Sequence, residues 1–292
     1  MRVHTVLPAV ILLVGSIGAE DAAGTTFTPA PISRTAEEIP NPYRGSYEWN
    51  REPVQPEGWP VLDGYLRVRW NQLESDDTPG DYDFSVFANE MARIQNRRGR
   101  LGIRVMAANS SDGGSAVPDY LMAAMPDGGW FTHPGEGTTV YAPDWNDPDF
   151  LTRAEALLQA LGAAFDDDPR LGWVDIGFYG DFGEWHLSEW PPEAEPMTPA
   201  NKRALIDAHL AAFPTSPLVM IIDDAEGLQY ALEQSERVGL RSDCLGEWWF
   251  QRDMELRFSE YPPAAERWKT APVITELCNP PVMAWAYQQI LD

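Results

Sequence analysis

The sequence predicts an α/β protein folded as a TIM-like (β/α)8 barrel. Short apolar runs rich in β-branched and aromatic residues alternate along the chain with segments of helical periodicity. This alternation is typical of parallel strands joined by right-handed helical crossovers. The length of 292 residues suits one barrel domain. Seven strand-like segments can be identified, so either an eighth is hidden or the barrel is incomplete at its C-terminal end.

The first segment has the pattern of a secretory signal peptide. Residues 1–19 combine a basic start, an apolar run too short for a stable membrane span, and small residues before the first acidic ones. Residues 20–40 are rich in Thr, Ala and Pro and form an irregular lead-in, and the barrel should span 41–292. We expect a secreted or periplasmic protein without membrane contact after cleavage; an uncleaved anchor is the alternative.

Three strands open the predicted barrel. Segment 41–49 joins a proline turn to an aromatic run, and 101–110 is a continuous apolar run. Between them, 64–75 alternates polar with apolar side chains and places Arg67 and Arg69 on one face. Because an unpaired buried charge is costly, these arginines should meet acidic partners inside the barrel.

Helices and one long connection separate the strands. Asp147 and Thr198 each precede a proline, the pattern of a capped helix start. A glycine-rich and aromatic-rich excursion over 111–145 is long enough to be functional. The predicted helices are 86–98, 147–165, 198–213, 225–237, 254–268 with a break at its prolines, and 282–291.

The fourth strand, 173–179, leads into the most informative stretch of the chain. It is apolar apart from one aspartate, as expected for a strand covered on both faces. Glycines then break the pattern, so Glu184, with Trp185 and His186 beside it, should stand where the strand opens into a loop. Barrel enzymes place their catalytic groups at such strand ends.

Three further strands end on polar residues in the same way. Segment 218–224 ends with Asp223 and Asp224, and 239–249 contains a second Gly-Glu-Trp triplet with Glu247 and Trp248. The last segment, 273–277, carries Glu276 before an asparagine and two prolines. Glu184 and Glu276 thus end two well separated strands. Hydrolysis of a sugar acetal needs such a pair of carboxyl groups, one to donate a proton and one to act as nucleophile or base.

Composition limits the partners. The net charge of −24, from 45 acidic and 21 basic residues, argues against nucleic acid, whose binding depends on basic contacts to phosphate. The 12 tryptophans favour a carbohydrate partner, because flat aromatic faces pack on sugar rings. The alternative is that most of them belong to the core. No histidine or cysteine spacing typical of a metal site and no phosphate-binding loop occurs, so neither metal nor cofactor is expected. The oligomeric state is not predicted.

The two cysteines, Cys244 and Cys278, each fall near the end of a predicted strand. They could form a disulfide in an oxidising compartment or remain two buried thiols.

Several motifs resemble a known group of proteins. They are NPYRGSYEW at 41–49, the arginine-rich strand with WNQLES and PGDYDFS, GEW after the fourth strand, and ITELCNPP near the C-terminal end. They look like a family of secreted bacterial barrel proteins distantly related to beta-galactosidases, within the superfamily of retaining (β/α)-barrel glycoside hydrolases. The resemblance covers roughly residues 39–292.

The resemblance implies a retaining double displacement. Glu276 would be the nucleophile, kept ionised by Arg69 or Arg67, and Glu184 would be the acid/base with a raised pKa. One position departs from the pattern, since Gly183 stands where many members have an asparagine that contacts the sugar 2-hydroxyl.

The sequence therefore predicts a secreted glycoside hydrolase acting on a neutral glycan, with Glu184 and Glu276 as catalytic residues. The alternatives are a non-catalytic carbohydrate-binding barrel and, less favoured, a metal-dependent hydrolase on the same fold. The residues expected to contact substrate are Trp49, Arg69, Trp185, His186, Asp223, Glu247 and Trp248.

Overall fold

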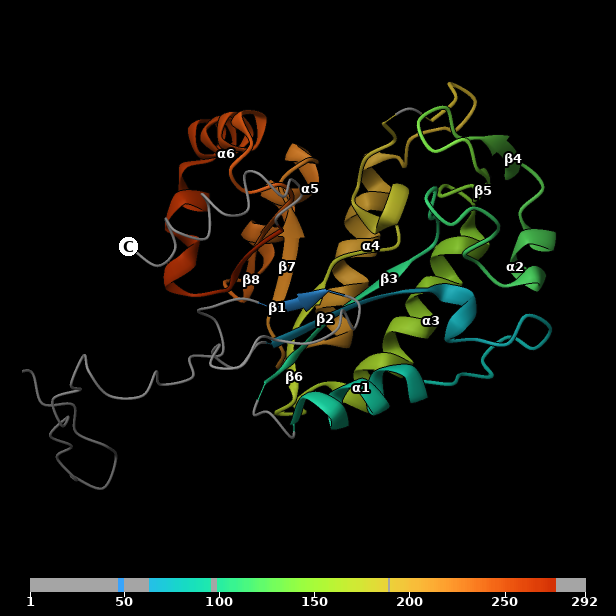
Figure 1. Ribbon diagram of the computed structural model, residues 1–292, viewed down its shortest axis with the longest axis horizontal. Coiled ribbons are helices and arrows are strands. Elements are labelled where there is room, and N and C mark those ends of the chain that lie inside the picture. Colours follow the sequence, from blue (N-terminus) through green and yellow to red (C-terminus); the bar gives the residue numbers. More distant parts are fainter. Residues whose placement is uncertain (1–46, 50–62, 96–98, 189, 277–292) are drawn as a thin grey trace, which may run out of the picture. The chain divides into compact units, whose positions relative to one another are not determined.

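A parallel sheet forms the centre of the computed structural model, which describes residues 47–49, 63–95, 99–188 and 190–276. All pairings within this sheet are parallel, and its strands follow one another in chain order, as the alternation of strand and helix predicts (Figure 1). The seven strands are β1 (Tyr47–Trp49), β2 (Asp63–Arg69), β3 (Leu101–Met106), β6 (Leu171–Asp175), β7 (Leu218–Ile221), β8 (Val238–Ser242) and β9 (Val273–Thr275). The predicted fold class, α/β with a curled parallel sheet of the TIM-like barrel type, is confirmed, and seven of its strands lie in the described residues.

The sheet curls until its first and last strands are within reach of one side chain. The hydroxyl of Tyr47 in β1 donates a hydrogen bond of 2.9 Å to the carbonyl of Thr275 in β9. The concave face is filled by large side chains, because Tyr65 stacks on Trp173 with their ring centres 5.9 Å apart. Gly102 in β3 makes room for this indole, since a Cβ atom there would lie 2.0 Å from it. The interior is a packed core, as in closed barrels.

Helices pack on the convex face of the sheet and bury the larger part of the core. The two predicted caps are confirmed: the side chain of Asp147 accepts from the amide of Asp149, and that of Thr198 accepts from the amide of Asn201. The helices are α1 (Ser85–Gln95), α3 (Pro148–Phe165), α4 (Pro199–Ala212), α5 (Ala225–Gln234) and α6 (Trp248–Glu260), followed by a 3-10 helix (Pro262–Lys269).

Two segments differ from the prediction. The excursion over 111–145 is not a structureless loop, because it contains the short helix α2 (Asp119–Ala124) and an antiparallel hairpin of β4 (Gly129–Thr132) and β5 (Thr139–Ala142). The strand predicted at 239–249 ends at Ser242 instead, and its last two residues already belong to α6. A left-handed turn at Cys244 separates the two elements.

The signal peptide at 1–19, the lead-in at 20–40 and the helix at 282–291 lie outside the described residues and stay predictions. Cys244 is disulfide-bonded. Cys278, the other cysteine of the sequence, is outside the described part of the chain. Among the described helices, none combines the length and apolarity that crossing a bilayer requires.

Candidate functional site

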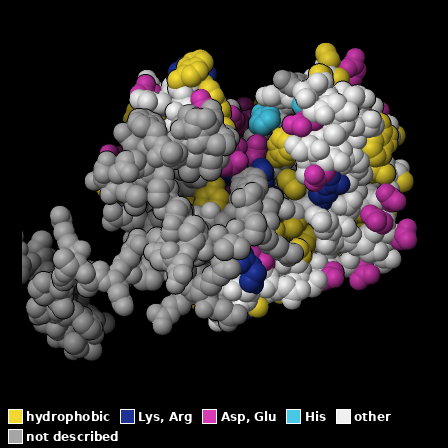
Figure 2. All heavy atoms as spheres, viewed as in Figure 1, with side chains coloured by type: hydrophobic (Ala, Val, Ile, Leu, Met, Phe, Trp, Pro, Cys, Tyr) yellow, Lys and Arg dark blue, Asp and Glu magenta, His cyan; other side chains and the backbone are white. Residues whose placement is uncertain are grey.

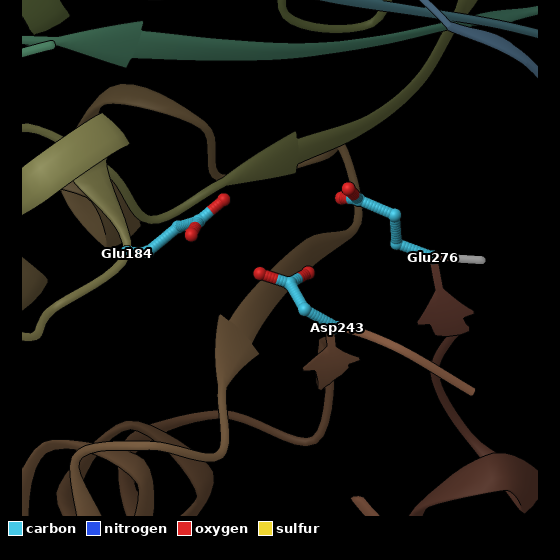
Figure 3. A group of neighbouring side chains, drawn as sticks. All are labelled: Glu184, Asp243 and Glu276. Carbon is cyan, nitrogen blue, oxygen red and sulfur yellow. The ribbon is translucent and has the colours of Figure 1, made fainter. Parts of the chain in front are cut away.

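Three carboxylates meet at the C-terminal edge of the curled sheet. Glu184 follows β6, Asp243 follows β8 and Glu276 follows β9. One oxygen from each of the three groups lies within 4.8 Å of those of the other two. Figure 3 shows the side chains of Asp243 and Glu276 arriving from two strand ends and that of Glu184 from a loop, all pointing into one shared space. The structure thus brings Glu184 and Glu276 together, as the sequence predicts, and adds Asp243.

The loop that presents Glu184 has a strained backbone. Phe178, Phe182 and Trp185 have φ angles of 68°, 53° and 60°, in the left-handed region that ordinary side chains avoid. Gly180 and Gly183 also have positive φ angles in the same loop. Residues held in this region cost about 1–3 kcal/mol each and persist only where the surroundings impose them.

Asp181 holds this loop in place. Its buried carboxylate accepts hydrogen bonds from the amide and hydroxyl of Ser110, at 2.9 and 2.6 Å, and from the indole of Trp190 at 3.1 Å. His133, from the β4–β5 hairpin, places its Nε2 atom 3.8 Å from the same carboxylate. The excursion after β3 therefore supports the loop that carries Glu184.

Glu184 is the most strongly compensated carboxylate of the site. It is 7% exposed, and its Oε1 atom accepts hydrogen bonds from Arg67 at 2.5 Å and from Arg104 at 2.7 Å. His186 lies 3.5 Å from Oε2. Burial pushes the pKa of Glu184 upward, but the His186 hydrogen bond and the charges of Arg104, Arg67 and Arg241 outweigh it and hold this pKa well below its usual range. The prediction of a raised pKa is wrong, because two barrel arginines bind Glu184.

Asp243 and Glu276 share a single cation, Arg241. The guanidinium donates to Glu276 Oε2 at 2.6 Å, contacts Asp243 Oδ1, and lies 3.5 Å from Asp175. Burial, together with repulsion from Glu184 and Glu276, raises the pKa of Asp243 to about 8, although the charges of Arg241 and Arg104 oppose this shift. The Asp243 carboxyl is therefore largely protonated at neutral pH.

A buried ion network forms the floor of the site. Asp175 on β6 accepts hydrogen bonds from Arg104 Nε at 3.0 Å and from the hydroxyl of Tyr65. Arg104 and Arg241 are 1% and 0% exposed. Since buried charges need partners, these arginines fix the positions of the carboxylates above them. The prediction that Arg67 and Arg69 meet acidic partners inside the barrel is confirmed for Arg67, which pairs with Glu184, whereas Arg69 pairs with the exposed Asp112.

The charge balance of the cluster disfavours a bound metal ion. Among the described residues, this trio of acids is the group close enough to share an ion. Its oxygens already contact guanidinium groups, which would repel a divalent cation placed between them. Four carboxylates share three guanidiniums, so a single proton restores neutrality; the residues are Asp175, Glu184, Asp243 and Glu276 with Arg67, Arg104 and Arg241.

Three of the predicted contact residues have surroundings that the sequence did not suggest, and substrate contact at Arg69 and Trp248 stays a prediction. Arg69 pairs with Asp112 of the excursion at 3.1 Å, and Arg241 takes the predicted place beside Glu276. Trp185 is 3% exposed and donates its indole N–H to Ile176 at 2.7 Å, so it is a core residue. Trp248 is 71% exposed on the first turn of α6, where it stacks against Arg252 rather than at a strand end.

Substrate contact at the other predicted residues stays a prediction. His186 touches Glu184, and Asp223 lies near enough to both for their charges to influence its pKa, which burial raises. Glu247 is half-buried in the position before α6, and a substrate contact there stays a prediction. The side chain of Trp49 is outside the described residues. His186 and Asp223 thus extend the acidic trio along the sheet edge.

A hollow lies at this edge, and a second cavity lies elsewhere on the protein. Figure 2 shows acidic side chains gathered in a hollow of the viewed face, with a histidine and basic side chains beside them. A cavity of about 520 Å3 adjoins Glu184 through Arg67; its lining also includes Arg69, Asn71, Gln72, Asn109 and Asp112. A second cavity of about 530 Å3 lies at the β4–β5 hairpin, away from the trio, and is lined by Trp130 and acidic residues. The geometry of the carboxylates, rather than cavity size, identifies the candidate site.

Comparison with known proteins gives only distant similarities. No model of a protein family matches the sequence. No curated protein is significantly similar to it. Among solved structures, endo-glycoceramidase II from Rhodococcus sp., bound to a cellobiose-like imidazole, is similar with a TM-score of 0.48 and 12% identity, over 80% of this chain and 62% of that one. The chain thus spans less than two thirds of that protein.

Two other structures are similar to a comparable or lower degree. The catalytic domain of beta-amylase from Paenibacillus polymyxa has a TM-score of 0.47 and 9% identity, over 74% of this chain and 85% of that one. The beta-galactosidase from Marinomonas ef1 has a TM-score of 0.39 and 9% identity, over 63% and 37%. All of these TM-scores lie below 0.5, so the function has to be inferred from the site itself.

Proposed function

We propose that the chain is a glycoside hydrolase that cleaves carbohydrate at the acidic trio. The observation that carries the proposal is the meeting of Glu184, Asp243 and Glu276 within 4.8 Å at the carboxyl edge of a curled parallel sheet. Barrel enzymes build their active sites at this edge. Cleavage of a glycosidic bond needs two carboxyl groups, one ionised and one protonated, and the trio brings carboxyl groups close enough together for both roles.

The spacing favours a retaining mechanism. In retaining enzymes the two carboxyl groups are about 5–5.5 Å apart, whereas inverting enzymes separate them by about 6.5–9.5 Å to admit a water molecule. Oxygen separations of at most 4.8 Å suit direct attack on the anomeric carbon. The attacking carboxylate forms an ester as the glycosidic C–O bond breaks, and water then cleaves this ester with the anomeric configuration retained.

Glu184 and Glu276 are the proposed pair on either side of the scissile bond. Both are held by arginines from the barrel interior, which orient the carboxylates. The net charge of −24 makes a neutral glycan a better substrate than an anionic one. The signal-like residues 1–19 support action outside the cytoplasm.

A panel of nitrophenyl glycosides tests this function. Wild-type protein should release nitrophenol from at least one sugar, and Glu184→Gln and Glu276→Gln should each lower kcat by about 100-fold or more, as loss of a catalytic carboxylate does. The matched control is Glu226→Gln on α5, which removes an exposed ion pair with Arg203 of α4. This variant should leave turnover unchanged.

Two outcomes would contradict the proposal. Glycan binding without turnover of any glycoside would identify a carbohydrate-binding barrel. Loss of activity in the presence of a chelator, restored by a divalent ion, would identify metal-dependent chemistry that the guanidinium-filled site does not predict.

A further inference from the structure

Asp243 occupies a position that the paired-glutamate scheme leaves without a role. It follows β8 directly, and one of its oxygens lies within 4.8 Å of both Glu184 and Glu276. Figure 3 shows its carboxylate turned into the space that the other two face. A group in this position can reach any glycosidic oxygen held between the two glutamates.

The hydrogen bonds of the three acids are unequal. Glu184 accepts two hydrogen bonds from guanidinium groups, and Glu276 accepts one from Arg241. Asp243 Oδ1 touches Arg241, yet within the described part of the chain this buried atom has no aligned hydrogen-bond donor. A proton on either glutamate would disrupt a charge-assisted hydrogen bond, whereas a proton on Asp243 would only weaken its ion pair with Arg241.

Resting on the hydrolase function proposed above, we infer that Asp243 is the proton donor of the reaction. When an ionised glutamate attacks the anomeric carbon, the carboxyl proton of Asp243 passes to the glycosidic oxygen, and the C–O bond breaks to release an alcohol. The Asp243 carboxylate then takes a proton from the water that cleaves the glycosyl ester. The second step restores the starting charge of both groups.

The charged surroundings of Asp243 agree with this role. Glu184 and Glu276 repel its charge, and burial adds to this effect, while Arg241 and Arg104 attract its charge. His186 and Asp223 lie beyond Glu184 and add one charge of each sign when both are ionised. Since the pKa of Asp243 is raised to about 8, its carboxyl group is protonated at neutral pH and gives up this proton to solvent as the pH rises above 8.

Leaving-group dependence tests the inference. Asp243→Asn should lower kcat/KM by about 100-fold or more on a phenyl glycoside, whose leaving oxygen needs a proton. It should have a much smaller effect on the dinitrophenyl glycoside of the same sugar. The variant should also lose the alkaline limb of the pH profile near pH 8. In the comparison variant, Glu184→Gln, kcat/KM should fall by the same factor on both substrates. If Asp243→Asn lowers kcat/KM equally on both substrates and leaves the pH profile unchanged, the donor role is overturned.

A second measurement needs no turnover. Infrared difference spectra of the full chain should show a protonated carboxyl band at pH 6 that disappears above pH 8 and is missing in Asp243→Asn. Turnover accompanied by an ionised Asp243 at pH 6 would refute the donor while leaving the hydrolase standing. A protonated Asp243 without turnover of any glycoside would refute the hydrolase, and the donor role with it.

Discussion

Protonation of His209 should destabilise the fold as the pH falls below 6.5. This histidine lies on α4, is 1% exposed, and stands behind the strand end that leads to the Glu184 loop. Its Nδ1 atom lies 2.8 Å from the carbonyl of Leu205, so Nδ1 carries the proton and Nε2 is the acceptor facing the amide of Gly177 at 3.4 Å. A second proton on Nε2 would place two donors against each other in a buried space.

The magnitude follows from the pKa of His209. Burial lowers this pKa from 6.5 to about 4, against the smaller effects of the Leu205 carbonyl and Asp175. Between these two pH values the unfolded chain binds the proton and the native protein does not, so the free energy of unfolding decreases as the pH falls. The stabilisation is fully present above pH 6.5. Up to about 3 kcal/mol is lost by about pH 4, at 1.36 kcal/mol per pKa unit.

Urea unfolding at pH 7, 5.5 and 4.5 measures this effect. His209→Gln should lower the free energy of unfolding at pH 7 and show a shallower decline than wild type toward pH 4.5. Ile206→Val, a neighbouring core truncation on α4 that keeps the histidine, should cost about 1 kcal/mol at every pH with the wild-type slope. Parallel pH curves for wild type and His209→Gln would refute the reasoning.

Three further variants test the frame of the site by urea unfolding. Tyr47→Phe removes the hydrogen bond to Thr275 and should cost about 1 kcal/mol; an unchanged midpoint would show that this link does not stabilise the curled sheet. Asp181→Ala leaves buried donors unpaired and should cost more than about 2 kcal/mol, and a loss below 0.5 kcal/mol, roughly the surface level, would contradict its role. Gly183→Ala, at φ +70° and with a Cβ 3.1 Å from a backbone oxygen, should cost about 1–2 kcal/mol, whereas Gly129→Ala, in open space, should be nearly neutral.

The strand order could be predicted from the sequence because it depends on local signals. Alternating strands and helices force parallel neighbours in chain order, and glycines after an apolar run mark a strand end. These signals placed Glu184 and Glu276 at the same edge. The prediction failed where long-range contacts decide. Which arginine reaches which acid depends on the relative displacement of strands, so Arg67 meets Glu184 while Arg69 reaches Asp112.

Asp243 shows a different limit of sequence reasoning. It precedes a cysteine and a glycine-containing turn, where an aspartate is usually a turn former. Its importance comes from its position next to two glutamates from other strands, which no local pattern reveals. The position of the Trp185 side chain could not be predicted for a related reason. The left-handed backbone at this residue turns its indole into the core, although its position beside Glu184 suggested a wall of the site.

Trapping of a glycosyl ester tests the central claim most directly. Incubation with a panel of 2-deoxy-2-fluoro glycosyl fluorides, followed by mass spectrometry of the peptides, should find one sugar esterified to Glu184 or Glu276. The label should be absent from the Gln variant of the esterified residue. An ester on a carboxylate outside the trio, or steady hydrolysis of glycosides with neither glutamate labelled, would contradict the account.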